Sequence, residues 1–142
     1  GRVLARTLEL PPEHVASALE LSSKAKAIRL ERRRLIDDHI VLTEDIWLPK
    51  ARFAALLDIA LEDFDNLLYP LYERRCGQVV ASARETLTVD SATADIAQQL
   101  GIEEGKPVVV IERLALGFDR KPLEWRRSHG AADTFRYQID IC

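Results

Sequence analysis

The sequence has few of the residues that build metal sites, disulfide frameworks or membrane spans. Among its 142 residues are two cysteines and three histidines, and neither set has the spacing of metal ligands. No apolar run approaches the roughly 20 residues that a membrane-spanning helix needs, and no charged-then-apolar signal segment stands at the N-terminus. We therefore expect a cytoplasmic protein of one domain, with reduced thiols, without a bound metal and without membrane association.

Motifs for phosphate binding and covalent catalysis are missing as well. There is no glycine-rich phosphate loop, no Gly-Lys-Ser motif and no nucleophile elbow, so we expect no cofactor and no catalytic residue. An acid and base pair formed by Glu44 and Glu124 stays open as a hypothesis, because the sequence gives neither their separation nor their pKa values. The formal net charge of -3 argues against nucleic-acid binding by the chain itself, although residues 32–34 are all arginines.

Residues 28–48 predict a β-hairpin that carries charged side chains in otherwise apolar rows. Alternate residues of a strand share a face, which places Arg32 and Arg34 in a row with isoleucine and leucine, and Glu44 in an apolar row of the returning strand. Burying a charge is costly unless the charge is paired. The pattern therefore indicates either a structural ion-pair network or a polar ligand, and the arginine fork suits a carboxylate or phosphate.

The length of the hairpin turn decides whether these charges meet. A three-residue turn at 37–39 places Glu44 opposite Arg32, so that both share one wall with Arg34. A two-residue turn at 37–38 moves Glu44 to the face opposite the two arginines. The sequence leaves both registers open.

The remaining chain predicts strands and helices in a repeated order. The expected strands are 3–10, 28–36, 40–48, 78–89, 107–116, 123–128 and 135–141. The expected helices are 12–19, 49–60, 65–75, with Asp65 or Asn66 as its cap and Gly77 at its end, and 91–100, with Asp90 or Ser91 as its cap. Residues 3–48 and 79–128 then form two similar halves, and superposing them places Glu44 on Glu124. We expect an α+β fold, in which helices pack on one antiparallel sheet built from two half-repeats.

Short motifs in a fixed order accompany this pattern. They are Glu31-Arg32-Arg33-Arg34 followed by Glu44 and Trp47-Leu48-Pro49, Leu68-Tyr69 before Gly77, Leu100-Gly101 with Gly105-Lys106-Pro107-Val108, Ile111-Glu112-Arg113, Pro122-Leu123-Glu124, and Asp133 through Tyr137. Each motif alone is weak. Together, over almost the whole chain, they resemble the UTRA effector-binding domain of bacterial transcription regulators in the HutC subfamily of the GntR family.

The resemblance implies a fold similar to chorismate lyase and a role as a sensor rather than an enzyme. Such domains bind a small metabolite, dimerise, and reach DNA through a winged helix-turn-helix domain for which residues 1–142 have no room. Effector binding then changes the DNA affinity of the homodimer through linkage. For this chain the resemblance implies effector contacts at five positions: Arg32, Arg34, Glu44, Tyr69 and Glu124.

The sequence departs from the sugar-phosphate-responsive members of this family. Leu67 stands where those members have a serine, Gly130 stands where they have a tyrosine, and the segment that precedes their first strand is missing here. The resemblance therefore implies a small anionic metabolite, for which a carboxylate or sugar acid is as suitable as a sugar phosphate. A chorismate-lyase-type enzyme and a module for dimerisation alone are the alternative functions.

Overall fold

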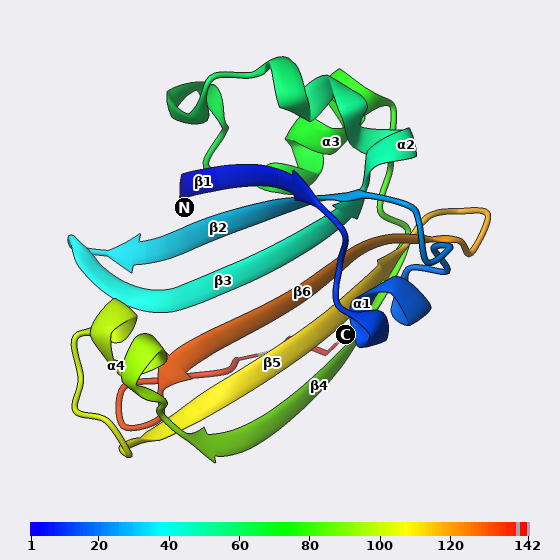
Figure 1. The fold of residues 1–142 in the computed structure, drawn as a ribbon. Helices are drawn as coiled ribbons and strands as arrows, with labels where there is room; N and C mark the ends of the chain where they lie inside the picture. Colours follow the sequence, from blue (N-terminus) through cyan, green and yellow to red (C-terminus); the bar gives the residue numbers. More distant parts are fainter. Residues whose placement is uncertain (139, 142) are drawn as a thin grey trace.

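The computed structural model describes residues 1–138, 140 and 141 as a curved antiparallel sheet with helices packed on it (Figure 1). The elements are β1 (Arg2–Glu9), α1 (Glu13–Ala18), β2 (Ala27–Ile36), β3 (His39–Pro49), α2 (Lys50–Phe53), the 3-10 helices η1 (Ala54–Asp58) and η2 (Leu61–Asp63), α3 (Leu68–Cys76), β4 (Ser82–Ser91), α4 (Ala94–Leu100), β5 (Pro107–Leu116) and β6 (Pro122–Ala131). The strand order is β1-β2-β3-β6-β5-β4, and all neighbours are antiparallel. The predicted α+β class is confirmed.

The sheet consists of two halves with the same order of elements. The strands β1, β2 and β3 with α1 form one half, and β4, β5 and β6 with α4 form the other. The halves meet where β3 pairs with β6, and Trp47 lies opposite Trp125 in that pair. This is the predicted half-repeat, and it brings the strands that carry Glu44 and Glu124 side by side.

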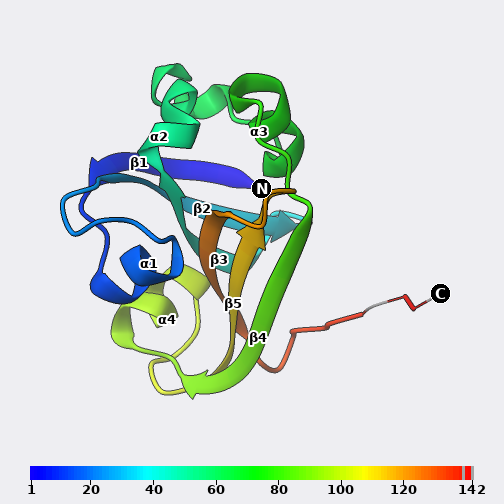
Figure 2. The same cartoon turned by 90° about the vertical axis from the view of Figure 1, so that its right-hand side faces the viewer.

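Alternation along the strands gives the sheet two covered faces (Figures 1 and 2). Ile28 and Leu30 of β2 pack with Phe53 in a core beneath α2, η1 and α3. Residues one position away on a strand point to the opposite face, and there Trp47 packs with Val15 of α1. The helix α4 packs over β5 in a third cluster. Each fully buried leucine-sized side chain contributes about 1.5–3 kcal/mol, so these cores hold the strands in place.

The segment after β3 is less regular than the α-helix predicted at 49–60. The helix α2 ends at Phe53, and the chain continues as the 3-10 helix η1. Phe53, Leu56 and Ile59 are all buried, and a spacing of three places side chains on one face of a 3-10 helix. The apolar spacing of this segment therefore fits the tighter helix.

The helix α3 begins later than predicted. Its first residue is Leu68, and no side chain caps it, although the sequence suggests Asp65 or Asn66 as the cap. Asp65 instead forms an ion pair with Arg74 at 2.6 Å. The predicted end is confirmed, since Gly77 follows the helix with a positive φ of 66°, a conformation that glycine adopts without strain.

The helix α4 also begins after its predicted cap. The sequence suggests Asp90 or Ser91, but β4 extends through Ser91. Thr93 caps the helix instead, because its hydroxyl accepts a hydrogen bond from the N–H of Ile96 at 3.2 Å. The strand β4 itself starts at Ser82, four residues after the predicted start.

The strand predicted at 135–141 is wrong for the residues that the structure describes. The chain leaves β6 through a turn in which the N–H of Phe135 donates to the carbonyl of Ala131, and residues 135–138, 140 and 141 are not in a strand. Ile139 lies outside the described residues. Figure 2 shows the tail leading away from the sheet. Alternation alone does not form a strand, because the backbone also needs a neighbouring strand to pair with.

The hairpin between β2 and β3 has the two-residue turn. Asp37 and Asp38 form it, with positive φ angles of 50° and 63°, as a type I′ turn requires. Ile36 pairs with His39 directly after the turn. This register, continued without change, would place the hairpin glutamate and the arginines on opposite faces.

A β-bulge further along the hairpin returns the glutamate and the arginines to the same face of the sheet. The register shifts between Arg34 and Leu35, with Val41 as the extra residue of the opposite strand. One extra residue exchanges the two faces of a strand. Arg32 therefore pairs with Glu44, which is the pairing predicted for the three-residue turn.

Candidate functional site

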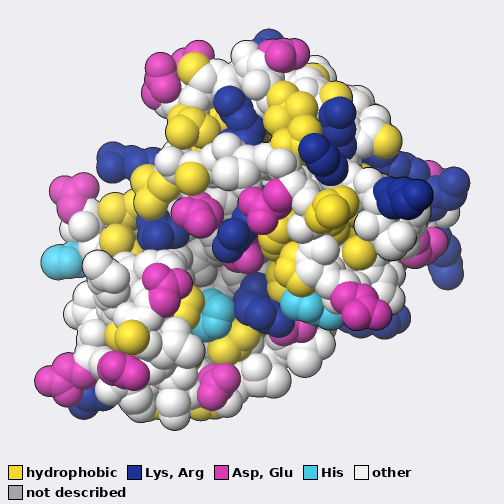
Figure 3. All heavy atoms as spheres, viewed as in Figure 1, with side chains coloured by type: hydrophobic (Ala, Val, Ile, Leu, Met, Phe, Trp, Pro, Cys, Tyr) yellow, Lys and Arg dark blue, Asp and Glu magenta, His cyan; other side chains and the backbone are white. Residues whose placement is uncertain are grey.

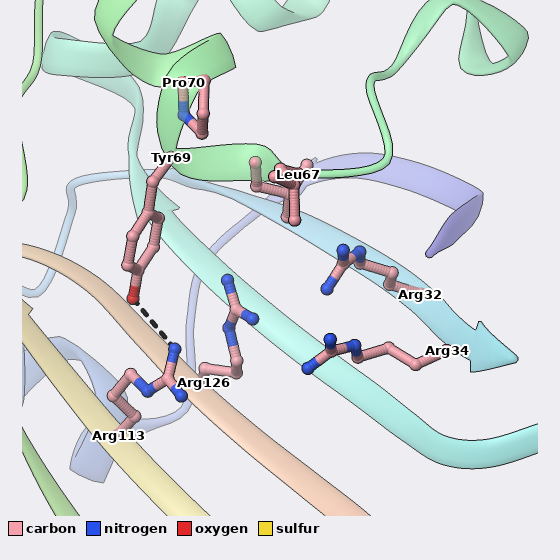
Figure 4. Close-up of a pocket in the computed structure, with 8 residues that line it drawn as sticks. Arg32, Arg34, Leu67, Tyr69, Pro70, Arg113 and Arg126 are labelled. Carbon is pink, nitrogen blue, oxygen red and sulfur yellow. Dashed lines mark hydrogen bonds between the residues drawn. The ribbon is translucent and has the colours of Figure 1, made fainter. Parts of the chain in front are cut away.

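A cavity of about 300 Å³ lies beneath the first turn of α3 (Figure 4). Its lining comes from β2, the start of α3, β5 and β6, and consists of four arginines, one tyrosine and three apolar residues: Arg32, Arg34, Arg113, Arg126, Tyr69, Leu67, Leu68 and Pro70. No carboxylate lines it. We name this feature the arginine cavity.

Arg32 is fixed in β2 opposite Glu44 of β3. Its side chain is buried, with 3% of the residue surface exposed. Nη1 donates to Glu44 Oε1 at 2.6 Å, and Nη2 donates to the backbone carbonyl of Asn66 at 2.6 Å. Both terminal nitrogens are therefore held, and the guanidinium meets the cavity in a set orientation.

Glu44 accepts hydrogen bonds from three directions in a buried position. Besides Arg32, the hydroxyl of Ser128 donates to Oε2 at 2.9 Å, and Arg126 Nη1 lies 3.5 Å from the same oxygen. Burial alone raises the pKa of Glu44, but the charges of Arg126 and Arg32 and the Ser128 hydrogen bond outweigh burial and hold the pKa of this carboxyl below its usual value. Glu44 is therefore ionised at neutral pH and is a poor general acid.

Glu124 is fully buried and pairs with an arginine on its own strand. Arg126 Nε and Nη2 donate to its two oxygens at 2.8 and 2.9 Å, and the hydroxyl of Tyr72 donates to Oε2 at 2.5 Å. Residues two apart on a strand share a face, so this pair forms within β6. Burial alone lowers the pKa of Arg126, but the charges of Glu124 and Glu44 raise it well above its ordinary value.

Arg113 and Tyr69 form the far side of the cavity. Arg113 Nη1 donates to the hydroxyl of Tyr69 at 3.1 Å, and its Nε and Nη2 contact Glu85 Oε1 at 2.8 and 2.6 Å. The guanidinium of Arg126 lies 5.7 Å from the centre of the Tyr69 ring. Burial and the charge of Glu124 raise the pKa of Tyr69, so its hydroxyl keeps a proton that it can donate to a ligand.

Arg34 differs from the other three arginines of the cavity. It is exposed at the open end of β2, and its guanidinium makes no ion pair within the described part of the chain. Figure 4 shows this side chain pointing into the cavity beside Arg32. The cavity therefore presents one cation whose charge is not neutralised by a nearby carboxylate.

A second hollow lies on the opposite face, beside α4 (Figure 3). It measures about 210 Å³ and is lined by side chains of both signs. Two of its arginines are paired, since Arg29 contacts Asp45 at 2.7 Å and Arg127 contacts Glu112 at 2.7 Å. Because four carboxylates share this lining with three arginines, whereas no carboxylate lines the arginine cavity, the arginine cavity is the better candidate for binding an anion.

The structure brings the five predicted site residues to one region of the sheet. Arg32, Arg34 and Tyr69 line the arginine cavity. Glu44 and Glu124 lie behind Arg126, which contacts both, and neither glutamate is part of the cavity lining.

Sequence reasoning misses Arg113 and Arg126, although each has a signal. Arg126 stands two residues after Glu124, so the strand period places both on one face. Arg113 interrupts an apolar row of the strand predicted at 107–116. The criterion that singles out the first hairpin, a charge in an apolar row, therefore also identifies Arg113 in the second hairpin.

The site offers hydrogen-bond donors and positive charge rather than metal ligands. Among residues 1–138, 140 and 141, no three histidine, cysteine, aspartate or glutamate side chains gather where they could hold a metal ion. In the same part of the chain, no helix has the length and apolar character needed to span a membrane.

Two curated relatives match most of the chain. The HTH-type transcriptional regulator Rv0792c of Mycobacterium tuberculosis is 25% identical over 131 residues, which are 92% of this chain and 48% of the relative. The HTH-type transcriptional regulator GgaR of Escherichia coli K12 is 26% identical over 126 residues, 87% of this chain and 48% of the relative. The chain spans about half the length of these relatives.

A solved structure and a family model agree with these relatives. The ligand-binding domain of a GntR-family transcriptional regulator from Bordetella bronchiseptica superposes with a TM-score of 0.89 at 27% identity, over 99% of this chain and 87% of that one. The family model of the UTRA domain matches residues 1–136. The chain therefore belongs to the UTRA domain family.

Proposed function

We propose that this UTRA domain binds a small anionic metabolite in the arginine cavity and reports it to a longer GntR-family transcription regulator, of the HutC subfamily. The observation that supports this most directly is the cavity lining, which contains four arginines and no carboxylate. A guanidinium donates two parallel hydrogen bonds to a carboxylate or phosphate. Such an anion would give Arg34 a partner of opposite charge.

The five predicted residues divide into two roles in this proposal. Arg32 and Arg34 bind the anion, and the Tyr69 hydroxyl adds a hydrogen bond. Glu44 orients Arg32, and Glu124 orients Arg126. The two glutamates thus act as positioning residues, in place of the direct effector contacts that the sequence suggests.

The class of anion includes carboxylates, sugar acids and sugar phosphates. Leu67 lines the cavity, where the sugar-phosphate-responsive members have a serine, so the cavity has few hydroxyl donors. The volume of about 300 Å³ is at the lower end of ligand pockets, which span roughly 300–1,000 Å³. A compact metabolite fits these dimensions.

The relatives support the regulatory part of the proposal. Both are named HTH-type transcriptional regulators, and the Bordetella structure is described as a ligand-binding domain. We infer that this chain is the sensing part of a cytoplasmic homodimer that contacts DNA through another domain. The effector acts by binding one arrangement of the dimer more tightly than the other, and no bond is made or broken.

A thermal-shift screen tests the binding proposal. The domain is heated with carboxylates, sugar acids and sugar phosphates, because a ligand of the folded state raises the melting temperature. Arg34→Gln removes the unpaired cation, and Arg33→Gln is the matched control on the opposite face of the same strand. We expect at least one anion to stabilise the wild type and Arg33→Gln but not Arg34→Gln. Equal stabilisation of all three proteins, or of none, contradicts the proposal.

A further inference from the structure

The buried glutamates have no free oxygen with which to recognise a ligand. Glu44 Oε1 accepts from Arg32, and its Oε2 accepts from Ser128 with Arg126 nearby. Both oxygens of Glu124 accept from Arg126, and one also accepts from a tyrosine hydroxyl. Neither glutamate lines the arginine cavity, so a ligand there meets the arginines rather than their carboxylate partners. The site is built for a ligand that accepts hydrogen bonds.

The charges behind the cavity cancel in pairs, which leaves Arg34 without an ion-pair partner among the described residues and Arg113 with one partly exposed partner. Arg32 and Arg126 are buried against Glu44 and Glu124, two cations against two anions. Arg34 makes no ion pair with the described residues. Arg113 contacts only Glu85 among the described carboxylates, and both side chains of that pair are partly exposed, at 29% and 24%, so water screens the pair.

Arg34 and Arg113 belong to strands that are not neighbours. Arg34 is in β2 and Arg113 is in β5, with β3 and β6 between them. Three spacings of about 4.8 Å separate the two strands by roughly 14 Å across the sheet, and the strand pairings offset Arg113 from Arg34 by about four further residues along the strands. Figure 4 shows the two side chains entering the cavity from opposite sides, with Arg126 between them. A small anion with one charged group, bound at either Arg34 or Arg113, leaves the other of these two arginines without a negatively charged group of the ligand beside it.

We propose that the effector is a compact dianion, with two anionic groups at opposite ends and few hydrogen-bond donors. Arg34, with Arg32, binds one end, and Arg113, with the Tyr69 hydroxyl, binds the other. A dicarboxylate or a phosphorylated carboxylate has this chemistry. The inference rests on the proposed function and adds Arg113 as the residue that selects dianions over monoanions.

Calorimetric titration with matched probes tests the inference. Dicarboxylates from succinate to pimelate are compared with monocarboxylates of equal chain length. We expect at least one dianion to bind about tenfold or more tightly than its matched monoanion, the gain of roughly one charge-assisted contact. Arg113→Gln should reduce the dianion to the affinity of the monoanion and leave the monoanion unchanged.

The control is Arg127→Gln, because Arg127, like Arg113, is a partly exposed arginine of the sheet that pairs with one glutamate. This variant should bind both probes as the wild type does, and thermal unfolding of both variants verifies that they fold. Equal affinity for dianion and monoanion, or no effect of Arg113→Gln beside a clear effect of Arg34→Gln, overturns the dianion inference and leaves the proposed function standing. Absence of any Arg34-dependent anion binding overturns both.

Discussion

Arg126 and Glu124, two residues apart on β6, form a buried bidentate ion pair with hydrogen bonds of 2.8 and 2.9 Å. Arg126 also reaches Glu44 of β3, so one guanidinium contacts a carboxylate from each half-repeat. In the first half, Arg32 stands across from Glu44, whereas in the second half Ala115 stands across from Glu124. Arg126 therefore supplies the positive charge that pairs with Glu124, because the facing residue of β5 is the uncharged Ala115.

Replacing Arg126 should destabilise the fold more than any replacement at the surface. Arg126→Met keeps much of the volume but leaves the buried Glu124 without a cation, and breaking a buried pair in this way costs about 3–5 kcal/mol. Urea unfolding measures the loss. Arg127→Met, at the next position but partly exposed, should change the free energy of unfolding by less than about 1 kcal/mol.

A second substitution checks the cause of that loss. Glu124→Gln in the Arg126→Met background removes the unpaired charge, so the double variant should be more stable than Arg126→Met alone. An Arg126→Met protein as stable as the wild type, or a double variant that is less stable still, would show that the pair does not balance these buried charges.

Acid should destabilise the protein through Glu44. The pKa of this carboxyl is lower in the folded state than its ordinary value of 4.5, so its contribution to stability is present above that value and is lost as pH falls through the folded-state pKa. We expect the difference in unfolding free energy between the wild type and Glu44→Gln to shrink as pH is lowered from about 7 to about 3. Urea midpoints across this range measure it, and a constant difference would refute the assignment.

The two tyrosines of α3 should respond differently to loss of the hydroxyl. Tyr72→Phe removes a donor to the buried Glu124 and should lower the free energy of unfolding by about 1.5–3 kcal/mol. Tyr69→Phe removes only the acceptor of Arg113, which keeps Glu85 as a partner, and should cost less stability while weakening anion binding. Urea unfolding and calorimetry separate the two effects. A reversed order of the stability losses would count against the network.

The hairpin turn should accept glycine more readily than a β-branched residue. Asp38 has a φ of 63°, a left-handed conformation that costs other residues about 1–2 kcal/mol relative to glycine. We expect Asp38→Val to be less stable than Asp38→Gly by about that amount, measured by thermal unfolding. Equal stability of the two variants would mean that the turn does not have this geometry in solution.

The sequence predicts the architecture well because the repeat and the strand period are local signals. Alternation identifies β2 and β3, and the continuous apolar run of residues 108–111 identifies β5. The repeated order of strand, helix, strand and strand predicts that the two halves pair in one sheet. Alternation fails at 135–141, because no sequence period shows whether a neighbouring strand is available. The predicted N-caps of α3 and α4 are wrong for a similar reason, because tertiary contacts use those residues elsewhere. Asp65 pairs with Arg74, and β4 extends through Ser91.

The sequence and the family resemblance together name Arg32, Arg34 and Tyr69 of the cavity lining, but they leave out Arg113 and Arg126 and do not decide the hairpin register. The sequence admits a two-residue or a three-residue turn, and the molecule combines the shorter turn with a bulge at Val41. No pattern in residues 28–48 marks that bulge. Arg126 has a same-face signal through Glu124, but its contact with Glu44 joins strands that are far apart in the sequence.

The most direct test of the central claim is a crystal structure of the domain with the anion that gives the largest thermal shift. We expect the anion to lie in the arginine cavity, within hydrogen-bond distance of Arg34 and Arg32, with Glu44 and Glu124 still bound to Arg126. An anion bound elsewhere, for example in the hollow beside α4, with the arginine cavity holding only water, would contradict the account.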